Sequence, residues 1–321
     1  MKKQIRKQFT LSKLARFHRP WHAGLAAVAA LLVIAAAAPP AYAQSGSVVA
    51  WGQPNAVPPQ NSQFVAVSAS SFSLGLKSNG KIVAWGPDCT GPNNVGQCNV
   101  PNPNSQYVAI SAGAGYGPSG FSLGLKADGS IRGWGHNNSG QTNIPLPNTG
   151  FVAIATGSLH ALGLKADGSI RAWGGNPYGQ TDVPVPNSGF KAVAAGGQGS
   201  MGLKTDGSIV VWGINIGGQH DVPEPNTDFV AIAEGSSFCI GLKADGTLVA
   251  WGDNSYGQLD LPVPNAGFIA IDAGAFHGLG RKADGSIVVW GRSDLGQAAV
   301  PPPNVGFIAM SAGGYNNLGI R

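Results

Sequence analysis

Histidines are the side chains in this chain best suited to acid–base or metal chemistry, but their positions argue against such a role. His160 and His277 occupy the same position of a repeated pattern, and other copies place Phe72, Gly199 or Asn316 there. A position that accepts phenylalanine and glycine is structural. The sequence also contains no G-x-S-x-G elbow, no H-E-x-x-H zinc motif, no C-x-x-C pair and no phosphate-binding loop. We therefore expect no catalytic residue, no metal and no cofactor, with a propeller hydrolase or lyase assembled from distant loops as the remote alternative.

Two of the three cysteines predict a disulfide. Cys89 and Cys98 flank an inserted segment, residues 90–97. In an exported protein such a pair is expected to be oxidised, and closing so short a loop would contribute about 2–3 kcal/mol in the chain-entropy treatment. The alternative is two free thiols. Cys239 lies in a strand pattern where another copy has Ala161, which predicts a small buried residue.

The first 43 residues read as a secretory signal peptide. Residues 1–22 carry seven basic and no acidic residues, residues 23–38 are apolar, and Ala41-Tyr42-Ala43 is a small-residue cleavage site. A membrane anchor is the alternative, but sixteen apolar residues are fewer than the roughly 20 that a spanning helix needs. We expect cleavage after Ala43, an exported (secreted or periplasmic) product, and no membrane attachment afterwards.

Removal of this segment reverses the sign of the net charge. The whole chain is +5, whereas residues 44–321 contain 13 Lys plus Arg and 15 Asp plus Glu. The basic balance therefore belongs to the leader, and nothing in the remaining chain indicates nucleic-acid binding, which requires a basic surface on the folded domain.

A repeat fills residues 44–321 and predicts one domain. Its tryptophans are separated by 34 and 49 residues and then four times by 39, a period typical of propellers and solenoids; they are Trp51, Trp85, Trp134, Trp173, Trp212, Trp251 and Trp290. The first copy starts halfway through the pattern and the last one stops halfway. These two half-copies are explained if the copies form a closed ring. The N-terminal strand can then complete the last sheet and protect its edge.

Each copy reads as four short antiparallel strands. In one copy, residues 151–155, 162–165 and 169–173 alternate or are rich in branched residues, and an Asp-Gly turn joins the second strand to the third. Residues 181–184 form an expected fourth strand, whose proline places it at an edge. The expected fold is thus all-β: a seven-bladed β-propeller of four-stranded blades, with the N-terminal strand completing the last blade.

The repeat resembles a known family. Its A-G-x-x-H-x-L-G-L-K and W-G-x-N-x-x-G-Q elements are similar to the repeats of the regulator of chromosome condensation family, and the short 39-residue form is similar to that of secreted members that inhibit β-lactamases. The resemblance spans residues 45–321 and implies a seven-bladed ring that binds another protein on one face. In those inhibitors the residue before the motif histidine is largely aromatic; here only Phe276 and Tyr315 are.

The loops that follow the first and third strands of each blade emerge at one end, which we call the loop face. Two insertions, residues 90–97 and 113–120, fall there in adjacent blades. Large side chains at the variable repeat positions would form an exposed patch typical of protein contacts, or would instead pack on neighbouring loops. The candidate partner-binding residues are Tyr116, Leu159, Tyr178, Tyr256, Phe276, Leu295 and Tyr315.

The opposite end is expected to carry a ring of cations. Each copy ends its L-G-L-K element in a basic residue, and aspartates such as Asp128 and Asp167 follow two residues later. We expect these aspartates to neutralise the lysines in a solvated rim.

These observations favour an exported, monomeric, non-enzymatic protein that binds another protein through its loop face. The alternative from the resemblance is an inhibitor of a β-lactamase or of a cell-wall enzyme.

Overall fold

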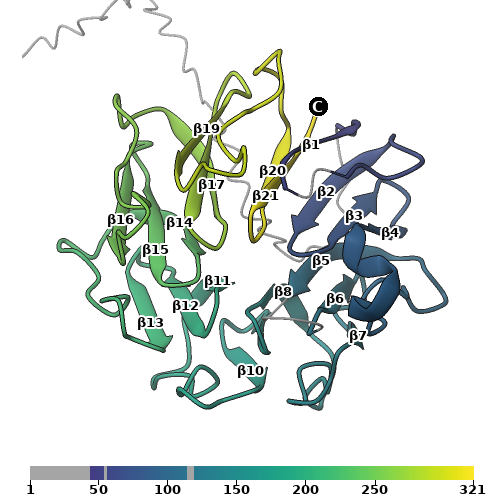
Figure 1. Cartoon of the computed structure of the whole chain (residues 1–321). Helices are drawn as coiled ribbons and strands as arrows, with labels where there is room; N and C mark the ends of the chain where they lie inside the picture. Colours follow the sequence, from purple (N-terminus) through teal and green to yellow (C-terminus); the bar gives the residue numbers. More distant parts are fainter. Residues whose placement is uncertain (1–43, 54–55, 114–118) are drawn as a thin grey trace, which may run out of the picture.

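A computed structural model of the protein describes residues 44–53, 56–113 and 119–321. The predicted signal peptide, residues 1–43, lies outside the described residues. Seven antiparallel sheets, each with three strands, stand around a common axis (Figure 1). In the described part of the chain, no helix is long and apolar enough to cross a membrane.

The seven blades repeat one strand order, with each middle strand hydrogen-bonded to an inner and an outer strand. The inner strands are β2 (Phe64–Ala69), β5 (Tyr107–Gly113), β8 (Phe151–Thr156), β11 (Phe190–Ala195), β14 (Phe229–Glu234), β17 (Phe268–Ala273) and β20 (Ala309–Ala312). The middle strands are β3 (Ser73–Lys77), β6 (Phe121–Lys126), β9 (His160–Lys165), β12 (Gly199–Lys204), β15 (Phe238–Lys243), β18 (His277–Lys282) and β21 (Asn316–Ile320). The outer strands are β4 (Ile82–Trp85), β7 (Ile131–Gly135), β10 (Ile170–Gly174), β13 (Ile209–Gly213), β16 (Leu248–Gly252), β19 (Ile287–Gly291) and, from the N-terminal end, β1 (Val48–Gly52). We number the blades from 1 (β2, β3, β4) to 7 (β20, β21, β1).

The prediction of a fourth strand was wrong. The segment after each outer strand contains at least two prolines, which have no N–H to donate to a ladder. An asparagine side chain makes the pairing instead: Asn187 Oδ1 accepts from the N–H of Ile170 at 2.7 Å, and Asn187 Nδ2 donates to the Ile170 carbonyl at 2.8 Å. The same two-bond contact recurs in every blade, from Asn61, Asn104, Asn148, Asn187, Asn226, Asn265 and Asn304. A single side chain thus replaces a strand.

The core lies between blades. Leu162, Leu164 and Ile170 of blade 3 pack against Phe190 and Trp212 of blade 4. Gly202 leaves the space that the Phe190 ring fills, because a Cβ there would lie 2.5 Å from that ring.

A polar contact also joins neighbouring blades. The indole Nε1 of Trp212 donates to the carbonyl of Gln180, one blade back, at 3.0 Å, and Gln180 is buried. The same bond ties Trp173 to Gln141 and Trp290 to Gln258. Each junction therefore combines apolar burial with a satisfied buried donor.

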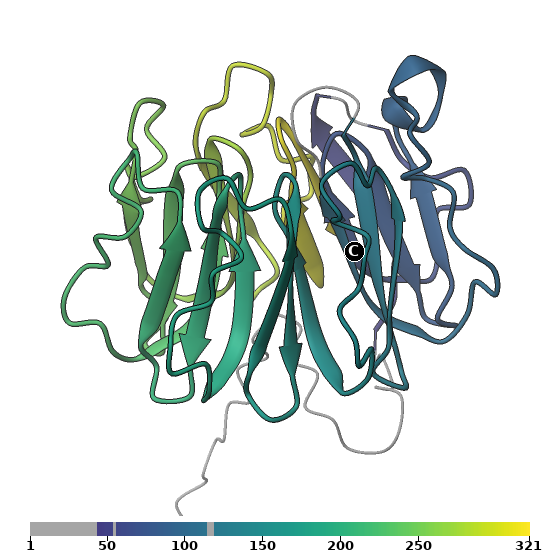
Figure 2. The same cartoon turned by 90° about the horizontal axis from the view of Figure 1, so that it is seen from below.

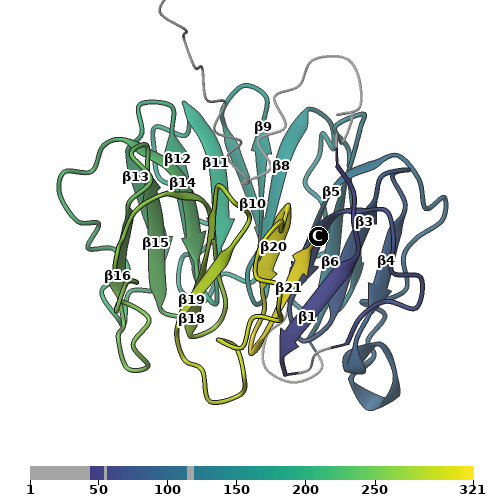
Figure 3. The same cartoon turned by 90° about the horizontal axis from the view of Figure 1, so that it is seen from above.

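The N-terminal strand completes the last sheet, as predicted. Strand β1 pairs with β21 from Val48 opposite Ile320 to Gly52 opposite Asn316 (Figure 3). Leu318 and Ile320 belong to one apolar cluster with Phe64 of blade 1, and the hydroxyl of Ser311 accepts from the N–H of Ala69 at 3.1 Å. The two ends of the repeat region are thereby joined by hydrogen bonds and by packing.

Candidate interaction face

The loops after inner strands and the loops after outer strands meet at one end of the propeller. In blade 6 the N–H of Arg292, just after β19, donates to the carbonyl of Phe276, just after β17, at 2.9 Å. In blade 7, Gln53 makes the same bond to Tyr315 at 3.0 Å. Seen from the side, the loops at this end include a tall projection formed by residues 86–98 (Figure 2). This end is the loop face.

Three of the predicted residues form one aromatic cluster on the loop face. The ring centroids of Tyr256 and Phe276 are 4.9 Å apart, and those of Phe276 and Tyr315 are 6.2 Å apart with the rings nearly stacked. Tyr256 is 48% exposed and Tyr315 is 38% exposed, while Phe276 is partly buried between them. The rings come from three consecutive blades, 5 to 7.

An arginine lies among these rings. The guanidinium carbon of Arg292 is 5.0 Å from the Tyr256 centroid, 5.8 Å from that of Phe276 and 5.1 Å from that of Tyr315, within the range of cation–π attraction. Asp294 accepts two bonds from the same guanidinium, at 2.7 and 2.8 Å. These bonds raise the pKa of Arg292 further and lower that of Asp294. Tyr256, Phe276, Tyr315 and Arg292 are hereafter called the aromatic patch.

The other predicted residues are spread over the face. Tyr178 is 51% exposed in the loop after β10, and Leu159 is partly buried with its Cβ near Gly175. Leu295 lies beside Tyr315 in a groove described below. Tyr116 lies outside the described residues.

Two loop-face residues escaped prediction. Ile216, 81% exposed in the loop after β13, precedes Gly217, and the prediction used only the residue before G-Q. Arg292 was missed because the patch was inferred from apolar residues alone. Its position directly after W-G, where the other copies have Gln, Pro, His, Gly, Ile and Asp, was the available signal.

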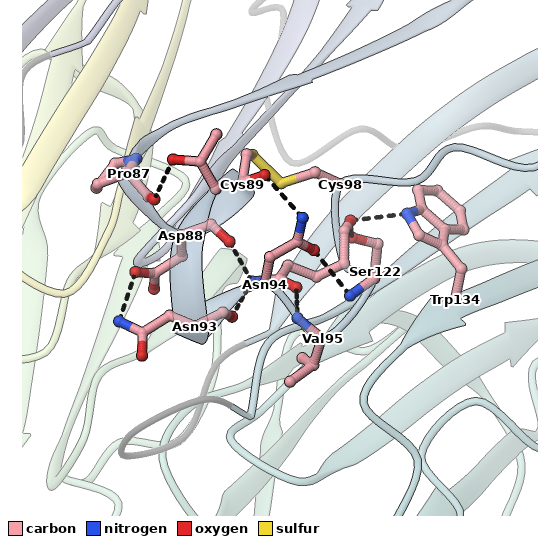
Figure 4. Close-up of a disulfide and its surroundings, with 12 residues drawn as sticks. Pro87, Asp88, Cys89, Asn93, Asn94, Val95, Cys98, Ser122 and Trp134 are labelled. Atoms are coloured by element: carbon pink, nitrogen blue, oxygen red, sulfur yellow. Dashed lines mark hydrogen bonds between the residues drawn. A yellow bond between two sulfur atoms is a disulfide. The ribbon is translucent and has the colours of Figure 1, made fainter.

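The projection on the loop face is held by the predicted disulfide. Cys89 and Cys98 are bonded, with Cα atoms 5.4 Å apart, across two short 3-10 helices, η1 (Pro87–Cys89) and η2 (Gly91–Asn93) (Figure 4). Asn94 Nδ2 donates to the carbonyl of Cys89 at 2.8 Å.

Gln97 anchors this projection to the propeller. Its side-chain Nε2 donates to the carbonyls of Asp88 and Asn93 at 2.8 and 2.9 Å. Its main-chain carbonyl accepts from the indole Nε1 of Trp134 in blade 2. A Cβ on Gly120, at the end of the second insertion, would lie 3.0 Å from Gln97 Cγ. The projection therefore has a defined shape and borders the second insertion.

A groove of ≈ 870 Å³ lies between blade 7, the loop after β19 and the projection. It is lined by Ala50, Trp51, Gly52, Gln53, Pro87, Leu295, Gly296, Ala299, Pro301 and Tyr315. Most of these side chains are apolar, and the groove meets the aromatic patch at Tyr315.

The histidines of the repeat serve the core. His160 and His277 are buried, with Nε2 bonded to Ser200 at 2.9 Å and to Asn317 at 2.7 Å in the next blade. Burial lowers the pKa of His160 to about 4 and also lowers the pKa of His277. In the described residues, no group of three or more His, Cys, Asp or Glu side chains is placed to hold a metal ion.

The central channel is a cavity of ≈ 790 Å³ lined by all seven inner strands. Its walls are mostly alanine, valine, isoleucine and glycine. Asp272 accepts from the N–H of Ala312 at 2.9 Å, and Ser68 accepts from the N–H of Ala112 at 3.0 Å. Polar side chains in the channel thus link neighbouring blades.

The lysines of the repeat, on the opposite end that we call the turn face, are held by the fold. Lys165 Nζ lies 3.7 Å from the centroid of Phe151 and donates to the carbonyls of Pro147 and Thr149. Asp167 accepts from the N–H and hydroxyl of Ser169. Within the described residues, Arg292–Asp294 is the only salt bridge, so the turn-face aspartates and lysines lie at the same turns without forming ion pairs.

Seven three-stranded sheets around one axis define a β-propeller. Residues 151–180, 229–258 and 268–297 match the family model described as Regulator of chromosome condensation (RCC1) repeat. Blades 3, 5 and 6 thus match this repeat model, and the predicted resemblance is confirmed at these positions. No curated protein sequence matches it.

Solved structures share the fold at low identity. Yeast RCC1 (Prp20), in its structure bound to Kap60, superposes with a TM-score of 0.70 at 16% identity over 98% of this chain and 96% of that one. Prp20p from Saccharomyces cerevisiae alone gives 0.69 at 17% identity, covering 86% and 91%. The CRINKLY WD40 ectodomain of the Arabidopsis thaliana receptor kinase ACR4 gives 0.63 at 24% identity, covering 79% and 92%.

Proposed function

We propose that this chain is an exported, monomeric, non-enzymatic protein that binds another protein through its loop face. The observation that carries the proposal is the aromatic patch: three aromatic rings and an arginine gathered on loops from three consecutive blades.

The patch residues occupy positions that the fold leaves free. At the position of Phe276 and Tyr315 other blades have Ser71, Gly120 or Gln198, so no aromatic ring is needed there to build a blade. Exposed aromatic residues and arginine are the types that dominate the binding energy of protein interfaces.

The turn face is less suited to binding. The ammonium group of Lys165 donates to a backbone carbonyl and lies over a phenylalanine ring. The same arrangement recurs at Lys204 and Lys243. A partner would have to break these contacts before it could use the charges.

Two further observations support the proposal. The structurally similar yeast protein is described as binding Gsp1p and histones and is seen bound to Kap60, which favours protein binding for this chain also. The apolar leader ending in Ala41-Tyr42-Ala43 and the Cys89–Cys98 disulfide favour an oxidising compartment outside the cytoplasm.

The test is capture from culture fluid by immobilised residues 44–321, followed by affinity measurement. Truncating interface aromatics typically costs 2 kcal/mol or more, so Phe276→Ala with Tyr315→Ala should weaken capture at least about thirtyfold. Lys165→Ala with Lys204→Ala on the turn face is the control and should not change it. Binding lost in the lysine variant and kept in the aromatic one would show that the loop face is not the binding surface.

A second candidate is an inhibitor of a β-lactamase or a cell-wall enzyme. The stacked pair Phe276 and Tyr315 favours it, because both rings occupy the position that is aromatic in such inhibitors. Titrating residues 44–321 into assays of purified β-lactamases and peptidoglycan hydrolases tests this; full activity of every enzyme at micromolar protein would count against it.

A further inference from the structure

The loop face of the propeller carries a net negative charge. The segments that follow the outer strands on the loop face contain one cation, Arg292, and six carboxylates, Asp88, Asp182, Asp221, Asp253, Asp260 and Asp294. Two histidines, His136 and His220, lie in the same segments. Net negative charge on one face creates a potential that attracts cations and repels anions.

The cations of the repeat lie at the other end. The middle strands end in Lys77, Lys126, Lys165, Lys204, Lys243 and Lys282, next to the Asp-Gly or Asn-Gly turns. The partly buried stems and carbonyl contacts of these lysines keep their charge at the turn face. Asp294 pairs with Arg292, and within the described residues the other loop-face carboxylates form no salt bridge.

Neutral groups hold the loop-face carboxylates in place. Asp182 accepts from Asn176 Nδ2 at 2.8 Å, and Asp260 accepts from Asn254 Nδ2 at 3.0 Å. Asp253 accepts from the hydroxyl of Ser255 at 2.5 Å. These bonds orient the carboxylates without cancelling their charge, which leaves that charge for a partner to meet.

One wall of the groove beside the aromatic patch has such a carboxylate next to it. Pro87 forms that wall and is followed by Asp88, whereas Asp294, before Leu295 on the other wall, is already paired with Arg292. Tyr315 adds exposed apolar surface. An occupant that fits both features has an apolar side chain for the groove and positive charges beside it.

We propose that the loop face recognises a protein segment in which an apolar or aromatic residue is flanked by lysine or arginine. The apolar residue enters the groove lined by Leu295 and Tyr315, and a flanking cation approaches Asp88. This inference rests on the proposed function and adds the chemistry of the partner. Apolar burial supplies affinity, while the carboxylates raise the association rate and exclude acidic partners.

The probes are short fluorescein-labelled peptides with a central leucine, phenylalanine or tryptophan, flanked by Lys and Arg, by Glu and Asp, or by Ser and Gly. Fluorescence polarisation with residues 44–321 should show the basic set binding about tenfold or more tighter than the acidic set at low ionic strength. The preference should shrink at high salt, where the Debye length falls to about 3 Å.

Paired variants locate the charge. Asp88→Asn with Asp253→Asn should weaken the basic peptides about two- to fivefold per removed charge. Asp167→Asn with Asp206→Asn on the turn face is the matched control and should change nothing. Leu295→Ala should weaken all sets alike, because it removes apolar surface and no charge.

Equal affinity for basic and acidic peptides, an effect of the turn-face pair equal to that of the loop-face pair, or no binding of any basic peptide would overturn the inference. These outcomes differ from failure of the proposed function. A partner whose capture depends on Phe276 and Tyr315, but which presents acidic segments, would keep the loop face as the binding surface and refute only its charge preference.

Discussion

At the scale of single residues, the repeat shows which side chains the fold requires. Phe72 and His160 occupy the same position, and both are buried. Space has to be filled there, and the polarity of the group that fills it is secondary. The sequence alone supported this conclusion, because the position varies between Phe, His, Gly and Asn.

One replacement of a buried ring by a side chain from the neighbouring blade could not be predicted. Blade 4 has Gly199 in place of that ring, and the carboxyl of Glu234 from blade 5 fills the space, so that a Cβ on Gly199 would overlap Glu234 Oε1. Burial raises the pKa of Glu234 well above its ordinary value. The two residues are far apart in the sequence, and the absence of a ring in one blade does not indicate which neighbour replaces it.

The buried His160 makes the stability of the folded protein depend on pH. Its pKa is about 4 in the folded chain, against an ordinary value of 6.5 for an exposed histidine, so the folded state binds fewer protons and loses stability as the pH falls from 6.5 towards 4. The difference amounts to roughly 3 kcal/mol at the low end. His160→Phe, which copies Phe72 at the same position of blade 1, should lose less stability than the parent between pH 7 and pH 4.5 in urea unfolding. Identical losses in both proteins would refute the role given to burial.

At the scale of elements, the three strands of each blade could be predicted and the fourth could not. Residues 151–155, 162–165 and 169–173 were expected as strands, and the structure has Phe151–Thr156, His160–Lys165 and Ile170–Gly174. The alternation of residues along the chain and the Asp-Gly turn between the second and third strands determine these three strands. The fourth segment has strand-like residues, but its prolines remove donors and Asn187 pairs with Ile170 instead. The recurring asparagine after the second proline was the missed signal.

Removing this asparagine tests its structural role. Asn187→Ala leaves the backbone N–H and carbonyl of Ile170 without their partner, which should lower the free energy of unfolding by about 1–3 kcal/mol. Asn187→Asp keeps an acceptor for the N–H but loses the donor, so its loss should be smaller at neutral pH. Urea unfolding of the three proteins at equal concentration measures the difference. Equal stability of all three would mean that the segment is held by other contacts.

At the scale of the molecule, the phase of the repeat predicted how its ends meet. The expected pairing of the first strand with the last is observed between β1 and β21. The loop face was also predictable from strand order, but the meeting of Tyr256, Phe276 and Tyr315 around Arg292 was not. That cluster depends on how far each loop leans towards the next blade, which sequence spacing does not determine.

Deleting residues 45–53 tests this closure. The deletion exposes the edge of β21 and uncovers Leu318 and Ile320, which should cause a large loss of stability and aggregation through the free edge. A synthetic peptide of residues 45–53 added in excess should restore part of the melting temperature by occupying the edge. A truncated protein that melts within about a degree or two of residues 44–321 would show that the clasp is dispensable.

The claim that the loop face is the working surface is tested most directly by hydrogen exchange of residues 44–321 with and without the captured partner. We predict slower exchange in the loops that present the aromatic patch, residues 253–257, 274–276 and 313–315, where a partner would exclude water and restrain the backbone. Exchange in the turns at residues 166–169 and 205–208 should stay unchanged. Protection confined to those turns, with the loop face exchanging as fast as in the free protein, would contradict the claim.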